Sequence, residues 1–343
     1  MKSDLKAPTL VRILNESLHK PIGDFVSVQG KRIRASLTGL SYTISGGSGS
    51  LPNGVGESIE LLHAGSLVID DIQDDSTERR GRPTLHRQMG QPLAMNAGNF
   101  MYFRALEVIA GSSVPFEARC KMTTEMIRAG RICHEGQAID LATNLYEYPA
   151  NDWSAITAAI TEQKTGTLVG LAMKLGAIAA EADHTMVTEL ARCGNQIGFA
   201  LQMRNDLQEL DDFANGRTER CDDLRHRRVT WPWVWFAEQR SSRQSRQMVN
   251  TVMLGLQRAQ IDSLREMAGE IVQTVDGVGQ REIGRRVDEP IRLLGEHVLS
   301  GEQLSALKEC LHPIRKSPSS NNDSSEPVRA SRAQFHNATE VSS

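Results

Sequence analysis

The strongest chemical signal in the sequence is a group of four aspartates, Asp70, Asp71, Asp74 and Asp75. Asp70 and Asp74 are four residues apart, so on a helix both carboxylates lie on one face. Carboxylates this close repel each other unless a cation lies between them. Mg²⁺ commonly uses one or two carboxylates together with the phosphates of a substrate. The spacing therefore favours a magnesium site over the alternative, a solvated acidic helix end beside a basic loop.

A pair of arginines, Arg79 and Arg80, follows the aspartates directly. Guanidinium groups match the oxygens of a phosphate as two-pronged donors. The order of acidic and then basic residues indicates a site for a metal-bound phosphate or diphosphate.

A second polar cluster lies in the stretch GFALQMRNDLQELDD. Asn205 and Glu209 share one helix face, Asp206 lies beside them, and Gln202 lies one turn earlier on the side of Asp206. Arg228 follows in the next charged segment and is available for phosphate. Alone, this cluster could equally be the charged face of an ordinary amphipathic helix. Opposite the aspartates, it would let metal ions hold one diphosphate from two sides.

Other residues fit a phosphate-binding cavity less specifically. Lys31 and Arg34 lie one turn apart at an expected helix start, although a basic helix cap is the commoner role. His63 precedes Asp70 by two turns, and a lone helical histidine is more often structural. Lys164, followed by Thr165, lies within an apolar stretch, so its ammonium needs a partner that a bound phosphate would supply.

The composition limits the classes of protein to which the chain can belong. The 343 residues are 39% hydrophobic and 24% charged with a net charge of -3, which argues against a nucleic-acid partner. Five cysteines without a CxxC pair argue against a zinc site or a disulfide framework and predict a cytoplasmic location. No run of 18 apolar residues occurs, so we expect no membrane span.

The periodicity of the apolar residues predicts an almost entirely helical chain. We expect one domain over residues 1–316 and a disordered polar tail over 317–343, because the tail has few large apolar residues. The predicted helices are Leu10–Leu18, Ile33–Tyr42, Ile59–Asp71, Leu93–Ile109, Phe116–Leu141, Trp153–Ala180, Met186–Leu210, Trp233–Met253, Ser263–Val275, Glu282–Leu299 and Glu302–Leu311.

The motifs and their order resemble those of the trans-isoprenyl diphosphate synthases, the polyprenyl synthetase family. IDDIQDDSTERRG resembles the first aspartate-rich motif of the family, and LQMRNDLQE resembles the second. GQAID and KTG lie between them in the family's order, and the match runs from GKRIR to TWP. The resemblance therefore covers most of the part expected to be ordered.

The resemblance implies an all-α isoprenoid synthase bundle around a deep central cavity, usually a homodimer. It implies head-to-tail transfer of the prenyl group of an allylic diphosphate onto isopentenyl diphosphate, with release of diphosphate and with two to three Mg²⁺ ions. The residues implied in catalysis are Asp70, Asp71, Asp74, Lys164 and Asp206. The implied metal ligands are Asp70, Asp74, Asn205, Asp206 and Glu209. The implied substrate-binding residues are Arg79, Lys164 and Arg228 for the allylic diphosphate, Lys31, Arg34, His63 and Arg80 for isopentenyl diphosphate, and in addition Thr165 and Gln202, of which Gln202 would also support the second metal site.

Three residues depart from the family pattern. Asn205 stands where an aspartate is usual, Ile69 where a histidine is frequent, and Arg228 where a lysine is usual. An amide oxygen can ligate Mg²⁺ with less charge, so Asn205 weakens the expectation of a third metal site. Gly65 and Ser66 are small where short-chain members place an aromatic, which predicts a product of C20 or longer. Aromatic residues of the following helix, within 100–103, could close the cavity instead.

Two alternatives stay open from the sequence. A class I terpene synthase on the same fold would ionise and cyclise one prenyl diphosphate, and Asn205 favours it somewhat. The basic residues expected for isopentenyl diphosphate favour chain elongation. A non-catalytic subunit of a heteromeric synthase is the other alternative, and the complete first motif argues against it.

Overall fold

The computed structural model describes residues 7–28, 32–297 and 299–315. The expected roles of Lys31 and the expected disorder of 317–343 lie outside these residues. Within them, no helix combines the length and the apolar character needed to cross a membrane.

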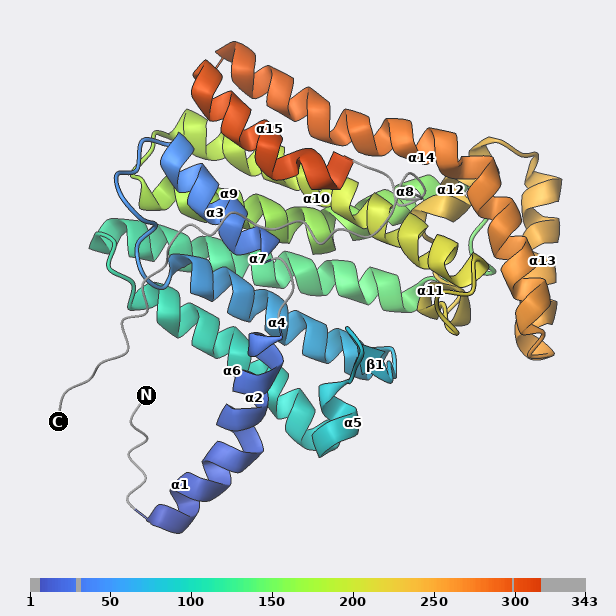
Figure 1. Ribbon diagram of the computed structural model, residues 1–343, viewed down its shortest axis with the longest axis horizontal. Coiled ribbons are helices and arrows are strands. Elements are labelled where there is room, and N and C mark those ends of the chain that lie inside the picture. The colour runs from blue at the N-terminus through green and yellow to red at the C-terminus, as the bar shows by residue number, and fades with distance from the viewer. Residues whose placement is uncertain (1–6, 29–31, 298, 316–343) are drawn as a thin grey trace.

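The described chain is a bundle of helices (Figure 1). The long helix α10 packs against α9 and α14, while α4 packs against α6 and α3 against α9. Two π-helical segments, η1 and η2, lie within longer helical runs. The elements are α1 (Pro8–Leu14), η1 (Asn15–His19), α2 (Lys20–Ser27), α3 (Ile33–Ile44), α4 (Val55–Gln73), β1 (Glu78–Arg79), β2 (Arg82–Pro83), α5 (Leu85–Met89), α6 (Gln91–Ala110), α7 (Phe116–Ala142), α8 (Ala150–Thr161), η2 (Glu162–Gly166), α9 (Thr167–Ala179), α10 (His184–Ala214), α11 (Asp222–Arg225), α12 (Trp231–Glu238), α13 (Ser242–Gln257), α14 (Ile261–His297) and α15 (Gly301–Arg315).

Two of the helix predictions are wrong in their continuity. The predicted helix Trp233–Met253 is two helices, α12 and α13, because Ser241 forms a capping box with Gln244 and starts a new helix. The predicted pair Ser263–Val275 and Glu282–Leu299 is the single helix α14. Gly279 lies inside α14, where an added Cβ would meet the Trp235 ring at 2.8 Å. Helix packing therefore overrides the low helix propensity of glycine here.

A short antiparallel hairpin follows α4, and the sequence did not predict it. Glu78 pairs with Pro83, and Arg79 pairs with Arg82. Both central residues of the turn, Arg80 and Gly81, have positive φ (55° and 74°), which is typical of the turns that favour two-residue hairpins. The hairpin fixes the backbone of Arg79 beside the end of α4.

Helices α9 and α10 touch backbone to backbone through glycines. An added Cβ at Gly198 of α10 would lie 2.6 Å from the Cα of Gly166, and one at Gly194 would lie 2.7 Å from the Val169 carbonyl oxygen. This approach brings η2 against α10, where the Thr165 hydroxyl donates to Gln202 at 2.6 Å. The glycines therefore set the separation between the two helical segments that carry polar residues.

Candidate active site

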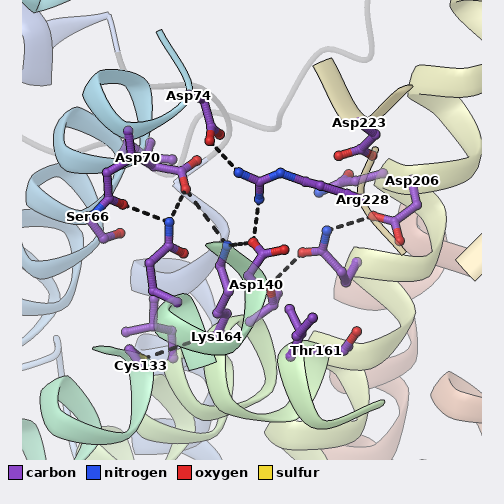
Figure 2. Close-up of a pocket in the computed structure, with 18 of the residues that line it drawn as sticks. Ser66, Asp70, Asp74, Cys133, Asp140, Thr161, Lys164, Asp206, Asp223 and Arg228 are labelled. Atoms are coloured by element: carbon purple, nitrogen blue, oxygen red, sulfur yellow. Dashed lines mark hydrogen bonds and ion pairs between the residues drawn. The ribbon is translucent and has the colours of Figure 1, made fainter. Parts of the chain in front are cut away.

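The predicted site residues converge on one cavity of about 400 Å³ (Figure 2). Helix α4 forms one wall, called here the α4 wall, with Asp70 and Asp74. Helix α10 forms the facing wall, the α10 wall, with Asn205, Asp206 and Glu209. The predicted residues that line the cavity are Arg34, His63, Asp70, Asp74, Arg79, Lys164, Thr165, Gln202, Asn205, Asp206, Glu209 and Arg228.

Two predicted residues lie outside this lining. Asp71 is buried behind the α4 wall and accepts two hydrogen bonds from Arg79 Nε, at 2.8 and 2.9 Å. Arg80 is exposed on the hairpin, although its charge lowers the pKa of His63 after the larger effects of burial, Arg34 and Arg79. Asp71 therefore orients Arg79 towards the cavity from behind.

The basic residues at the α4 wall are paired with carboxylates. Lys164 Nζ forms an ion pair with Asp140 and lies 3.8 Å from Asp70 Oδ1. Arg228 joins Asp140 to Asp74, one terminal nitrogen to each (Figure 2). The sequence predicted a substrate phosphate as the partner of Lys164; the structure shows that Asp140, from α7, satisfies its charge.

Two carboxyl groups at the α4 wall, those of Asp71 and Asp74, have raised pKa values, so their protonated forms are favoured. Burial, followed by the negative charge of Asp70, raises the pKa of Asp74 to about 6. Arg228 and Lys164 act against this shift. Burial also raises the pKa of Asp71, although the hydrogen bond from Arg79 opposes it. A cation between Asp70 and Asp74 would therefore favour the ionised carboxylates.

The α10 wall holds its carboxylates with neutral donors. Asp206 accepts hydrogen bonds from the Gln202 side-chain amide at 2.7 Å and from the Trp231 backbone amide at 3.1 Å. Glu209 accepts one from the backbone amide of Asp223 at 3.2 Å. Burial raises the pKa of all three carboxyl groups, Asp206, Glu209 and Asp223. Burial therefore disfavours the charged form of these three carboxyl groups.

Several polar cavity residues were not assigned to the site from the sequence, among them Gln137, Asp140 and Asp223. Gln137 of α7 donates an interhelical hydrogen bond to Asp70 of α4 at 3.0 Å. Asp223 belongs to the short helix α11. No spacing to another acidic residue marks Asp140 or Asp223; they lie in the site because α7 and α11 pack there.

A second basic group lies apart from Lys164 and Arg228. Arg34 of α3 and His63 of α4 both line the cavity, and Arg34 Nε and His63 Nδ1 are buried without a hydrogen-bond partner. Burial lowers the pKa of Arg34 to about 10, although Glu60 opposes the shift. Burial, followed by the charge of Arg34, lowers the pKa of His63 well below its usual value. The unpaired guanidinium N–H of Arg34 suits an anionic ligand, and a neutral His63 can donate one hydrogen bond to the same ligand.

The side chains of the cavity have the oxygen donors that magnesium needs, but they are not gathered around one point as metal ligands. Across the described ranges, no three His, Cys, Asp or Glu side chains already gather as ligands. The oxygen donors of both walls, including Asn205, are those that Mg²⁺ prefers. Lys164 lies beside Asp70 and Arg228 pairs with Asp74, so both carboxylates already face a cation of the protein. Binding at the α4 wall therefore requires these pairs to open.

Comparison with known proteins agrees with this geometry. The family model described as polyprenyl synthetase matches residues 15–271. The chain belongs to the polyprenyl synthetase family. The match includes both walls of the cavity and every described residue that we predicted for the site.

Sequence relatives in this family carry more than one activity name. The chain is 30% identical to a terpene synthase of Matsumurasca onukii over 64% of this chain and 70% of that protein. It is 31% identical to a short chain isoprenyl diphosphate synthase of Methanothermobacter thermautotrophicus over 57% of this chain. That alignment spans 58% of the archaeal enzyme, little more than half of its length.

The fold is that of solved prenyl synthases. A geranylgeranyl pyrophosphate synthase from Corynebacterium glutamicum, solved with isoprenyl diphosphate and magnesium, superimposes with a TM-score of 0.75 and 21% identity. The alignment covers 92% of each chain. The all-α isoprenoid synthase architecture expected from the sequence is confirmed.

Proposed function

We propose that this polyprenyl synthetase is a Mg²⁺-dependent prenyltransferase that joins isopentenyl diphosphate head-to-tail to an allylic prenyl diphosphate. The observation that carries the proposal is the presence of two separate basic groups in one cavity. Lys164 and Arg228 lie between the acidic walls, and Arg34 and His63 lie apart from them. Two anionic substrates need two such groups, whereas a cyclase binds one diphosphate.

In this proposal, the allylic diphosphate lies between the walls and contacts Arg79, Lys164 and Arg228. Two to three Mg²⁺ ions held by Asp70, Asp74, Asn205, Asp206 and Glu209 would neutralise the charge of the departing diphosphate. The C1–O bond of the allylic substrate breaks and leaves an allylic cation.

The second substrate then supplies the electrons for the new bond. Arg34 and His63, with Lys31 and Arg80, would hold the diphosphate of isopentenyl diphosphate. Its double bond attacks C1 of the cation, and a proton is lost to the released diphosphate. Apolar cavity residues such as Leu168 and Ile69 keep water from the cation.

We propose a product of C20 or longer, but with a cavity end formed by α6. An added Cβ at Gly65 would meet the Gly98 carbonyl oxygen at 2.9 Å and the Tyr102 ring at 3.0 Å. The space beside Gly65 is thus filled by α6 and is not open cavity. Of the four residues 100–103, Tyr102 lines the cavity, with its ring edge-on to His134 at 5.6 Å. Tyr102→Ala should lengthen the product.

The cyclase remains the second candidate because of Asn205 and the Matsumurasca onukii relative. A product assay separates the two. Purified protein with Mg²⁺ receives C5, C10, C15 or C20 allylic diphosphate, either alone or with isopentenyl diphosphate. Longer prenyl diphosphates formed with isopentenyl diphosphate support the proposed reaction. Hydrocarbons or alcohols from the allylic substrate alone, without elongation, would overturn it.

We also propose a homodimer in a reducing compartment such as the cytoplasm. Phe116 and Ile127 of α7 are 74% and 57% exposed, and Phe103 of α6 is 72% exposed. Phe116 and Ile127 are eleven residues, about three turns, apart, so they share one face of α7. An apolar face of this kind suits a subunit contact. The five cysteines are all free, which agrees with the proposed reducing compartment. Light scattering after gel filtration should give twice the chain mass for the native protein and the monomer mass for Phe116→Asp.

A further inference from the structure

Five charged side chains are linked in series across the cavity by four ion pairs (Figure 2). We call this set the ion-pair ring, in the order Asp70, Lys164, Asp140, Arg228 and Asp74. The two end carboxylates do not pair with each other; the backbone at the end of α4 closes the ring, where the Asp74 amide donates to the Asp70 carbonyl at 2.9 Å. The ring joins α4, α7, η2 and the segment before α12, which come from four separate parts of the sequence.

Asp140 differs from the other two carboxylates of the ring. It contacts both cations, whereas Asp70 and Asp74 each contact one cation of the ring. It projects from α7, and its side chain is 9% exposed, against 30% for Asp70 and 13% for Asp74. It is therefore placed to hold Lys164 and Arg228 independently of the state of the α4 wall.

Resting on the proposed function, we propose that Asp140 is a positioning residue that keeps Lys164 and Arg228 in place while Asp70 and Asp74 exchange them for divalent cations. Without Asp140, Lys164 and Arg228 would pair only with the carboxylates of the α4 wall and would compete there with the metal. With it, they stay beside the cavity, where a diphosphate can accept their hydrogen bonds.

The balance of charge supports this role. In the ring, three carboxylates face two cations, so one negative charge is in excess. Removing the charge of Asp140 leaves two carboxylates for two cations. Each cation would then pair with the α4 wall alone, and a partly buried pair of this kind is costly to break. Metal binding at Asp70 and Asp74 should weaken as a result.

The test is Asp140→Asn in the full-length protein, with Mn²⁺ as a probe for the carboxylate site and free Mn²⁺ measured by electron paramagnetic resonance. No diphosphate is added, so the result does not depend on turnover. We expect the Mn²⁺ dissociation constant to rise about tenfold, as for other residues that orient metal ligands. An unchanged constant in a folded Asp140→Asn protein would overturn the proposal.

The matched control is Glu125→Gln on the same helix. Glu125 also pairs with a lysine, Lys174 of α9, at 2.8 Å, but outside this cavity. We expect Mn²⁺ binding within twofold of the native protein. Asp140→Glu keeps the charge and should restore most of the affinity lost in Asp140→Asn, which a purely steric role of the residue would not explain. A tenfold loss in Glu125→Gln would overturn the proposal, because any broken ion pair on α7 would then act alike.

A second variant, Arg228→Lys, should tighten Mn²⁺ binding instead of weakening it. It also tests the proposal if Asp140→Asn does not fold. Arg228 reaches Asp140 and Asp74 with separate nitrogens, which the single ammonium of a lysine cannot reproduce. Arg228→Lys should release Asp74 and tighten Mn²⁺ binding about threefold, the size of a modest ion pair. Weaker binding would contradict the ring. Failure of the native protein to elongate prenyl chains would overturn the proposed function and leave this Mn²⁺ result standing.

Discussion

Asp70 and Asp74 on the α4 wall face basic side chains, whereas Asp206 and Glu209 on the α10 wall accept hydrogen bonds from neutral amides. The α4 wall is therefore charge-compensated and must give up its partners to bind a metal. The α10 wall keeps its partners and lacks positive charge, and burial raises the pKa of both its carboxyl groups. Similar acidic motifs can therefore hold their carboxylates in two ways before a metal binds: with cations that must be displaced, or with neutral amides that can stay in place.

The largest expected effect comes from removing a carboxylate of the α4 wall. Asp70→Ala should lower kcat by about 10³-fold or more, because charge neutralisation at the leaving group is lost. Steady-state elongation assays at saturating Mg²⁺ measure it. The control is Asp75→Ala, since Asp75 is an exposed aspartate paired with Arg87 outside the cavity. Near-native activity of Asp70→Ala would remove the metal assignment from this wall.

Changing the separation of the walls should have the next largest effect. Gly198→Ala would put a methyl group 2.6 Å from the Gly166 backbone, so η2 and α10 must move apart. A misplacement of about 1 Å can cost about 10²-fold in rate, and we expect kcat to fall by about that factor. Gly130→Ala on α7 is the control, because no atom lies within 4 Å of its added Cβ. Equal activity in both variants would argue against a fixed separation.

The pH dependence of metal binding should report Asp74. Its pKa of about 6 means that the carboxylate is mostly protonated at pH 5 and mostly ionised at pH 7. Mg²⁺ needs the ionised form, so Mg²⁺-dependent binding of inorganic diphosphate should weaken about tenfold between pH 7 and pH 5. Titration calorimetry at the two pH values measures it. Equal affinities at both would contradict the raised pKa.

The same shift has a consequence for stability without divalent cations. The folded protein holds the Asp74 proton more tightly than the unfolded chain, because the pKa rises from 3.8 to about 6 on folding. This carboxyl therefore lowers the free energy of unfolding as pH rises from about 4 to 6. The free energy of unfolding, measured with urea, should therefore fall less between about pH 4 and 6 in Asp74→Asn than in the native protein.

The smallest effect is expected at the α10 wall. Asn205→Asp adds a carboxylate where an amide now lines the cavity, so the Mg²⁺ concentration for half-maximal elongation should fall about threefold. Elongation itself should be preserved or raised. A clear loss of elongation would mean that Asn205 has a role that an aspartate cannot fill, as a cyclase would require.

The sequence predicted the parts of the site that depend on local spacing. The i, i+4 pairs Asp70–Asp74 and Asn205–Glu209 line the cavity as their helical positions imply. Asp140 and Asp223 could not be assigned in this way, because their role depends on how distant helices pack. The partner of Lys164 was missed for the same reason, since Asp140 lies 24 residues earlier in the chain.

The helix predictions failed for two different reasons. The break between α12 and α13 depends on a local signal that periodicity overlooks, the capping box of Ser241 and Gln244, whereas the continuity of α14 depends on Trp235 packing over Gly279. The hairpin after α4 was too short to show alternation. Local propensity is a weak guide at such points, because packing routinely overrides it.

The glycine contact between α9 and α10 has a consequence for how this enzyme could diversify. Where two helices meet without side chains, no substitution can adjust their spacing gradually, since even a methyl group is too large. The separation of the acidic walls therefore cannot be tuned in small steps by substitution. Under the proposed function, variation in product length would arise between α4 and α6, where mutation can enlarge or trim the Tyr102 side chain.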